Sequence, residues 1–130
     1  MLNNKGQSLI LFVIMLPILL LIFVLVIDIG KVIVLKQELD NINNIVLDYG
    51  MDNLDKVNIE DELIDLVKLN NNEIDEIDIY VEDTKIYSNI SEDVEGIFLQ
   101  FVDISIFNVK SSYVGYIDDN EKRIERIVGD

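Results

Sequence analysis

The side chains of this sequence that could do chemistry are mostly carboxylates. Its 130 residues include 25 Asp and Glu but no His and no Cys, so the usual general base and the thiolate nucleophile are both missing. At this density, neighbours such as Asp118 with Asp119 or Glu92 with Asp93 arise by chance, and solvated acidic loops are a better interpretation than an acid–base pair. We therefore expect no enzyme, and we assign no catalytic or cofactor-binding residue and no small-molecule substrate.

The run Asp118, Asp119, Asn120 and Glu121 deserves separate consideration as a calcium site. It offers the oxygen ligands that Ca²⁺ prefers, but it lacks the spaced ligands and the glycine of an EF-hand loop. We predict a turn between two strands here, and we assign no metal ligand.

The net charge of −15 narrows the choice of partners. Lys5 and Asp28 are the only charged side chains before Lys31 and they cancel, so the whole excess lies in residues 31–130. Such a field repels phosphate backbones, and no basic stripe interrupts it, which excludes nucleic-acid binding. Cations and basic surfaces are the electrostatic partners that remain.

The elements that position these carboxylates begin with a membrane segment. After the short leader Met1–Gly6, the residues from Leu9 to Ile27 are uncharged and almost wholly apolar. As a helix they would be roughly 28 Å long, which matches the hydrocarbon core of a bilayer. The alternative is a cleaved secretory signal, but no Ala-x-Ala site follows Ile27, so we predict a retained span over 7–28. We expect a cytoplasmic N-terminus because the leader is so short, although charge counting alone does not settle the orientation.

An amphipathic helix is predicted to continue the span over 29–50. Apolar residues recur there at spacings of three and four, Gly50 is a natural stop, and the simplest structure is one helix from about Ser8 to Tyr49. A core-facing helix is favoured over a coiled-coil stalk because no heptad is sustained. The predicted buried stripe is Ile29, Val32, Ile33, Lys36, Leu39, Ile42, Ile45, Val46 and Tyr49, and the predicted polar face is Gln37, Glu38, Asp40, Asn41, Asn44 and Asp48.

Residues 51–130 are predicted to form a small acidic α+β head. Asn58 would cap a second helix that buries Ile59, Leu63, Leu66 and Val67, and the alternating residues 77–82 would pair through an Asp83–Thr84 turn with a strand from Lys85 to Ile90. Ser91–Asp93 would cap a short helix that buries Val94, Phe98, Phe101 and Val102. A long strand over 104–117 follows, and Arg123–Val128 is interpreted as the second strand of a hairpin, with a helix as the alternative. The predicted sheet is mostly antiparallel.

The opening residues resemble a known family. The run Lys5, Gly6, Gln7, Ser8, Leu9, Ile10, Leu11 and Phe12, then Pro17, and finally Asp28, Ile29, Gly30 and Lys31, is similar to the N-terminal region of TadE/TadG-like pseudopilins of the Tad (Flp, type IVc) pilus machinery. The similarity covers roughly the first 50 residues and leaves the head unassigned. It implies a pilin-like architecture.

The resemblance also implies processing and assembly. A prepilin peptidase would cut between Gly6 and Gln7 on the cytoplasmic side and leave the span as a single-pass anchor, with the head outside the cytoplasm. The partners would be the membrane, the peptidase, other pilins or pseudopilins and the assembly platform. The residues implied in anchoring and assembly are Leu11, Phe12, Pro17, Asp28, Gly30 and Lys31. Pro17 would loosen the helix for transfer from bilayer to filament, or be a simple kink.

One departure from the family pattern suggests a particular role. The fifth residue after the cleavage site is often a glutamate that neutralises the amine of a neighbouring subunit, whereas here it is Leu11. A subunit without that carboxylate suits a tip or priming position, or else an anchor that never polymerises. The sequence therefore favours a minor pseudopilin or assembly component of a Tad-type pilus or related secretion system, in a tip or priming position. The alternative is a permanently anchored extracytoplasmic binding or sensory module.

Overall fold

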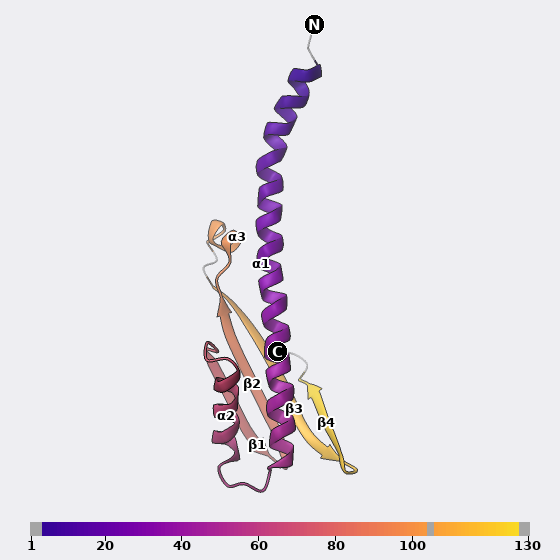
Figure 1. Cartoon of the computed structure of the whole chain (residues 1–130), viewed down its shortest axis with the longest axis vertical. Coiled ribbons are helices and arrows are strands. Elements are labelled where there is room, and N and C mark those ends of the chain that lie inside the picture. Colours follow the sequence, from indigo (N-terminus) through magenta and orange to yellow (C-terminus); the bar gives the residue numbers. More distant parts are fainter. Residues whose placement is uncertain (1–3, 104–105, 128–130) are drawn as a thin grey trace.

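The computed structural model describes residues 4–103 and 106–127. The chain forms an α+β structure with one long helix and a four-stranded sheet, as predicted (Figure 1). The elements in chain order are α1 (Asn4–Asp52), α2 (Ile59–Asn70), β1 (Glu76–Glu82), β2 (Lys85–Val94), α3 (Ile97–Phe101), β3 (Phe107–Asp118) and β4 (Glu121–Arg126).

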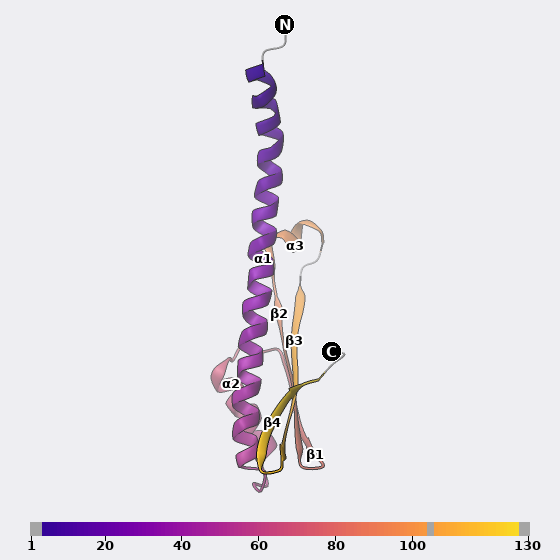
Figure 2. The same cartoon turned by 90° about the vertical axis from the view of Figure 1, so that its right-hand side faces the viewer.

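Helix α1 serves as both the projecting rod and one layer of the head. It runs through Pro17 and Gly30 and ends two residues beyond Gly50, which confirms the single long helix predicted from the sequence. Figures 1 and 2 show its N-terminal part standing clear of the other elements down to the level of α3, while its C-terminal half lies along the sheet. The same helix therefore meets two different environments.

The core of the head lies between α1, α2 and one face of the sheet. Leu39, Val46 and Leu47 of α1 are fully buried, and they pack with Leu63 of α2 and Ile86 of β2. The remaining buried apolar residues are Leu35, Ile42, Met51, Ile59, Val67, Ile79, Ile90 and Val109. The expectation that α1 completes the core of the head is confirmed.

The prediction of which face of α1 is buried was partly wrong. Ile29, Ile33, Ile45 and Tyr49 are exposed, whereas Leu35, Asn43 and Leu47 are buried. The helix is apolar over more of its circumference than one neighbour can cover, so spacing alone could not show which stripe meets the sheet. Asn43 was missed because an amide is tolerated in a core only when it finds partners, and those partners lie on distant strands.

Helix α2 covers one side of the core as predicted. Ile59, Leu63 and Val67 are buried, and Leu66 is partly buried against them. Asn58 occupies the N-terminal position but its side chain makes no capping hydrogen bond; instead its carbonyl oxygen accepts from the Glu62 amide at 3.1 Å. The acidic first turn and Lys68 in the last turn complement the helix dipole.

The sheet is a meander in the order β1-β2-β3-β4, with every pair antiparallel. Two-residue turns join β1 to β2 and β3 to β4, and their central residues Asp83, Thr84, Asp119 and Asn120 all have positive φ. This is the backbone that a tight hairpin with right-handed twist requires. The hairpin interpretation of the last segment is confirmed through Arg126, and the strand predicted over 104–117 begins at Phe107, with 104–105 outside the described residues.

The prediction for Ser91–Val94 was wrong. These residues do not begin a helix but extend β2, where Ser91 pairs with Lys110 and Val94 with Phe107. Pairing with β3 satisfies their backbone groups, and this long-range contact outweighs the local capping preference. Helix α3 begins only at Ile97, and Phe101 and Val102 are exposed rather than buried.

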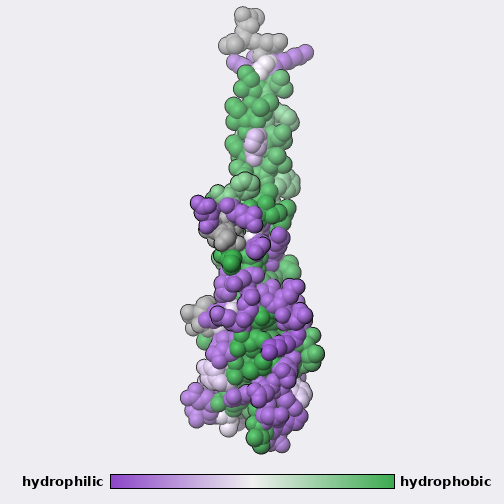
Figure 3. All heavy atoms as spheres, turned by 90° about the vertical axis from the view of Figure 1, so that its left-hand side faces the viewer, coloured by the Kyte–Doolittle hydropathy of each residue, from purple (hydrophilic) through white to green (hydrophobic). Residues whose placement is uncertain are grey.

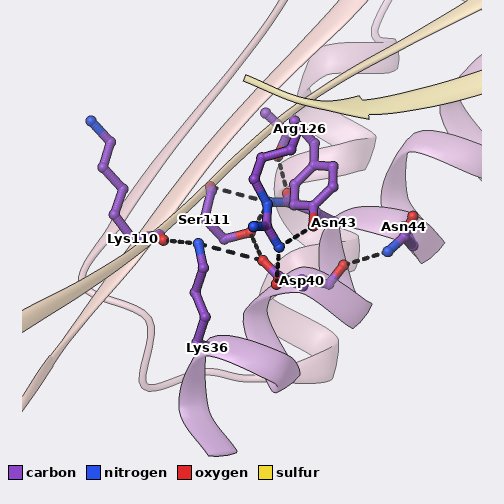
Figure 4. A network of polar contacts seen from close by, with 9 residues as sticks. Lys36, Asp40, Asn43, Asn44, Lys110, Ser111 and Arg126 are labelled. Carbon is purple, nitrogen blue, oxygen red and sulfur yellow. Dashed lines mark hydrogen bonds and ion pairs between the residues drawn. The ribbon is translucent and has the colours of Figure 1, made fainter. Parts of the chain in front are cut away.

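A buried polar network fixes α1 on the sheet (Figure 4). The Asn43 amide nitrogen donates to the carbonyl oxygen of Ser111 at 3.1 Å and to its Oγ at 2.8 Å, while Ser88 Oγ donates to Asn43 Oδ1 at 2.6 Å. Ser111 Oγ in turn donates to Asp40 Oδ1 at 2.6 Å, and Arg126 reaches the other Asp40 oxygen at 3.3 Å. Asn43, Ser88 and Ser111 are completely buried, so their groups depend on one another for partners.

Two glycines allow the layers to approach closely. A Cβ at Gly50 would lie 2.6 Å from Ile86 Cδ1 and 3.0 Å from Leu63 Cδ1. A Cβ at Gly115 would lie 3.2 Å from Leu47 Cβ. Gly50 therefore lies inside α1 at the point where α2 and β2 converge on it, rather than ending the helix.

We expect Asn43→Ala to lower the free energy of unfolding of the head by about 2–4 kcal/mol, because it leaves buried polar groups of Ser88 and Ser111 without their partner. Asn41→Ala, on the exposed side of the same helix, should change it by less than about 0.5 kcal/mol. Chemical denaturation followed by circular dichroism measures both. Equal effects of the two substitutions would contradict a dependence of the head on this network.

Candidate membrane and assembly surface

The N-terminal half of α1 presents an apolar surface on every side. The large apolar residues from Leu9 to Leu16 are all substantially exposed, and the most apolar 18-residue window of the helix has no buried residue. Figure 3 shows this part as a mostly green rod above a head on which purple prevails. A helix of this length and composition indicates single-pass membrane anchoring, because lipid satisfies the exposed side chains while the backbone bonds stay internal.

Asp28 marks the point where this rod meets the head. Its side chain is 4% exposed, although it follows directly on the apolar span. Asp28 Oδ1 accepts a hydrogen bond from the Ile97 amide at 2.9 Å, and Oδ2 accepts one from the Phe98 amide at 2.6 Å. The carboxylate thus caps the first turn of α3 from another element, where donors of a helix otherwise lack partners.

Several of the other residues predicted for anchoring and assembly have exposed side chains. Leu11 and Phe12 are exposed by 62% and 60%, and Lys31 is also exposed. A Cβ added at Gly6 or at Gly30 would meet nothing within 4 Å. Within the described chain, packing therefore accounts for Asp28 but gives no reason for glycine at either position.

The sequence did not reveal the link between Asp28 and α3. Ser91, Glu92 and Asp93 drew attention to a local cap, whereas the acceptor comes from 69 residues earlier in the chain than Ile97. The sequence signal that could have revealed this link was the single carboxylate directly after the apolar span.

An apolar hollow of about 210 Å³ lies beside Asp28. It is lined by Leu25, Asp28, Ile29, Val32, Ile33 and Phe107.

Acidic side chains crowd the edge where the C-terminal end of β2 lies beside the loop after α2. Burial raises the pKa of Glu92, and the nearby carboxylates of Glu38, Glu73 and Asp75 raise it further. The Asn71 amide, which donates to Glu92 Oε1 at 2.9 Å, opposes the shift. Ionising Glu92 is therefore less favourable than ionising a free carboxyl group, and an approaching copy of the same surface would add carboxylate repulsion.

Three basic residues, Lys122, Arg123 and Arg126, lie on the edge strand β4. Lys122 of β4 contacts Asp48 at 3.1 Å and Asp52 at 2.7 Å, and these contacts raise its pKa. These exposed pairs hold β4 beside the end of α1 with only modest energy. Within residues 4–103 and 106–127, no three carboxylates gather as a metal site would require, and Asp118–Glu121 forms the β3–β4 turn.

A comparison with known families found a match to the N-terminal part of the chain, which includes the exposed part of α1. Residues 6–42 match a family model described as putative Flp pilus-assembly TadE/G-like. The match confirms the resemblance found at the N-terminus. It runs from Gly6 through Leu11, Pro17 and Asp28 into the part of α1 that packs on the sheet. No curated protein and no solved structure matches the chain.

The TadE/G-like match supports the interpretation of the protein as a component of pilus assembly. Such a component would associate with a membrane and with pilins. The matched family is one of assembly proteins rather than enzymes. Its match ends at residue 42, so α2, β1–β4 and α3 lie beyond it. Asp28 lies within the matched segment but acts on α3 outside it.

We expect Asp28→Ala to release the first turn of α3, because the amides of Ile97 and Phe98 lose their acceptor. The local opening free energy should fall by about 1–2 kcal/mol, the usual effect of removing a helix cap. Amide hydrogen exchange at Ile97 and Phe98 measures it, with Glu95→Ala, an exposed neighbour, as the matched control. Unchanged exchange at both amides in the Asp28 variant would show that its carboxylate does not hold α3.

Proposed function

We propose that this protein is a minor pseudopilin of a Tad-type pilus or a related secretion system. The observation that carries the proposal is the apolar half of α1, which is exposed on all sides and bears the TadE/G-like match. Such a helix suits both states that a pilin passes through, because lipid can surround it first and other helices can replace the lipid later. The glycine at position 30, for which the chain itself offers no packing reason, would permit close approach of a neighbouring helix.

Processing at the N-terminus is the first step of this proposal. A prepilin peptidase would cleave between Gly6 and Gln7, with the N-terminus in the cytoplasm and the head outside it. Gly6 lies in the first turns of α1 and is exposed, so no part of the described head covers the bond. The leader 1–6 would leave, and 7–28 would remain as the anchor below the amphipathic part 29–50 and the acidic head 51–130.

A tip or priming position follows from Leu11. Its side chain is exposed and apolar where a shaft subunit would need a carboxylate to neutralise the N-terminal amine of its neighbour. An unpaired ammonium in the apolar interior costs several kcal/mol, so this chain is poorly suited to add beneath another subunit. A first subunit has no neighbour above it and loses nothing by having leucine there.

The charge of the head supports low copy number. Residues 31–130 carry a net charge of −15, so subunits stacked side by side would repel one another over the roughly 8 Å Debye length of physiological salt. Within one head, the carboxylates of Glu38, Glu73 and Asp75 add to the effect of burial in raising the pKa of Glu92. A single subunit per filament avoids this repulsion between copies.

A second candidate is a permanently anchored extracytoplasmic binding module. It is favoured by a hollow of about 330 Å³ on the sheet, lined in part by Glu76, Asp78 and Lys110. Ser91 also lines it, and its buried Oγ has no hydrogen-bond partner among the described residues. This function would need no cleavage at Gly6, which makes processing the deciding experiment.

Intact mass and N-terminal sequencing of the protein from native membranes test the processing step. With the prepilin peptidase present we expect a chain that begins at Gln7, and without it a chain that begins at Met1. Gly6→Leu should abolish the cleavage because a large side chain replaces the glycine, whereas Asn4→Leu, two residues earlier, should not. An uncut chain in the strain that has the peptidase would favour the anchored module.

Copy number in purified filaments tests the tip position. We expect wild-type protein in small amounts relative to the main pilin, and a several-fold increase for Leu11→Glu because the new carboxylate can pair with a neighbouring amine. Ile14→Glu, nearly one turn further along α1, supplies the same charge in the wrong place and should give no increase. Wild-type abundance equal to that of the main pilin would contradict both the tip position and the minor role.

A further inference from the structure

Helix α3 and its flanks carry large apolar side chains that the core does not use. Phe101 is 74% exposed, and Ile97 and Val102 are each about half exposed. Ile106 and Phe107, at the start of β3, are exposed to a similar degree. These five residues, which we call the α3 patch, lie outside the buried cluster formed by α1, α2 and the sheet. Exposed apolar groups that gather in this way usually mark a contact surface.

The position of the α3 patch along α1 is fixed by Asp28. Its carboxylate holds the Ile97 and Phe98 amides, so α3 lies at the level where the apolar span ends. Both views show α3 at the end of the head nearest the N-terminus, beside α1 (Figures 1 and 2). If residues 9–27 fill the hydrocarbon core, as their length of roughly 28 Å requires, α3 lies at the membrane surface.

We propose that the α3 patch docks into the interfacial region of the same bilayer that α1 crosses. Aromatic and aliphatic side chains at this depth partition into the boundary between headgroups and acyl chains, as those of interfacial helices do. The apolar surface of α1 continues past Asp28 as Ile29 and Ile33, which are exposed and line the hollow that Phe107 closes. The α3 patch is thus continuous with the surface that lipid already covers.

Charge indicates which lipids the α3 patch meets. Residues 95–103 include Glu95 and Asp103 and no basic residue, so anionic headgroups would repel this segment rather than attract it. Burial of apolar side chains must then provide the contact, and zwitterionic lipid is its natural surface. The inference depends on anchoring by α1 and not on pilus assembly, so it holds equally for a pseudopilin and for a permanently anchored module.

The chain has no tryptophan, which allows a single fluorescent reporter to be placed at will. Phe101→Trp puts it in the α3 patch, and Val57→Trp puts it at a fully exposed position of the connection between α1 and α2, at the opposite end of the head. Each full-length variant is reconstituted at one copy per nanodisc in phosphatidylcholine, with or without bromine on the upper acyl chain. We expect bromine to reduce the emission of Trp at 101 about twofold and that of Trp at 57 not at all.

Replacement of part of the phosphatidylcholine by phosphatidylglycerol should weaken the quenching at 101, because the acidic segment is repelled. Val102→Trp serves as a second reporter, and circular dichroism verifies that each variant is folded. Equal, unquenched emission at 101, 102 and 57 would overturn the proposal. So would a blue shift at 101 that appears only when several copies share a nanodisc, since the α3 patch would then contact a neighbouring subunit. Neither readout requires the peptidase or a filament, so failure here leaves the proposed function to its own tests.

Discussion

The structure depends on the attachment of one half of α1 to the sheet. Leu39, Val46 and Leu47 supply the apolar part of this contact, and the amide of Asn43 supplies its register by bonding to strands β2 and β3. A helix that is apolar over much of its surface could bury more than one face, with similar energy. Because only one rotation of α1 brings the Asn43 side chain to Ser88 and Ser111, the polar network selects among these faces.

This attachment explains how one helix can serve two surroundings. Beyond Asp28 towards the C-terminus, the sheet covers one side of α1, while towards the N-terminus no described residue of the helix is buried. The carboxylate at the junction bonds to α3 and so ends the head at the same level at which the span begins. The TadE/G-like match covers both the span and this junction.

The sequence was sufficient to predict the long helix, α2, the antiparallel strands and both hairpins, because each depends on local periodicity and turn residues. It misplaced the buried face of α1, since Ile29, Ile33 and Ile45 fit the spacing as well as Leu35 and Leu47 do. It also misread Ser91–Asp93 as a cap, because pairing with β3 is invisible to local preference. Among the predicted site residues that the structure describes, Asp28 has contacts that give it a physical role; the roles proposed for Gly6, Leu11 and Gly30 involve molecules outside this chain.

The continuity of α1 from Asn4 to Asp52 has a mechanical consequence. A helix without a hinge transmits rotation about its own axis, so the azimuth of the head is set by the rotation of the span far below it. Each residue of an α-helix advances the phase by about 100°. The number of residues between the span and Asn43 therefore determines which side of the head faces a neighbour, and a single inserted residue would turn the acidic edge around Glu92 by more than a quarter of a circle.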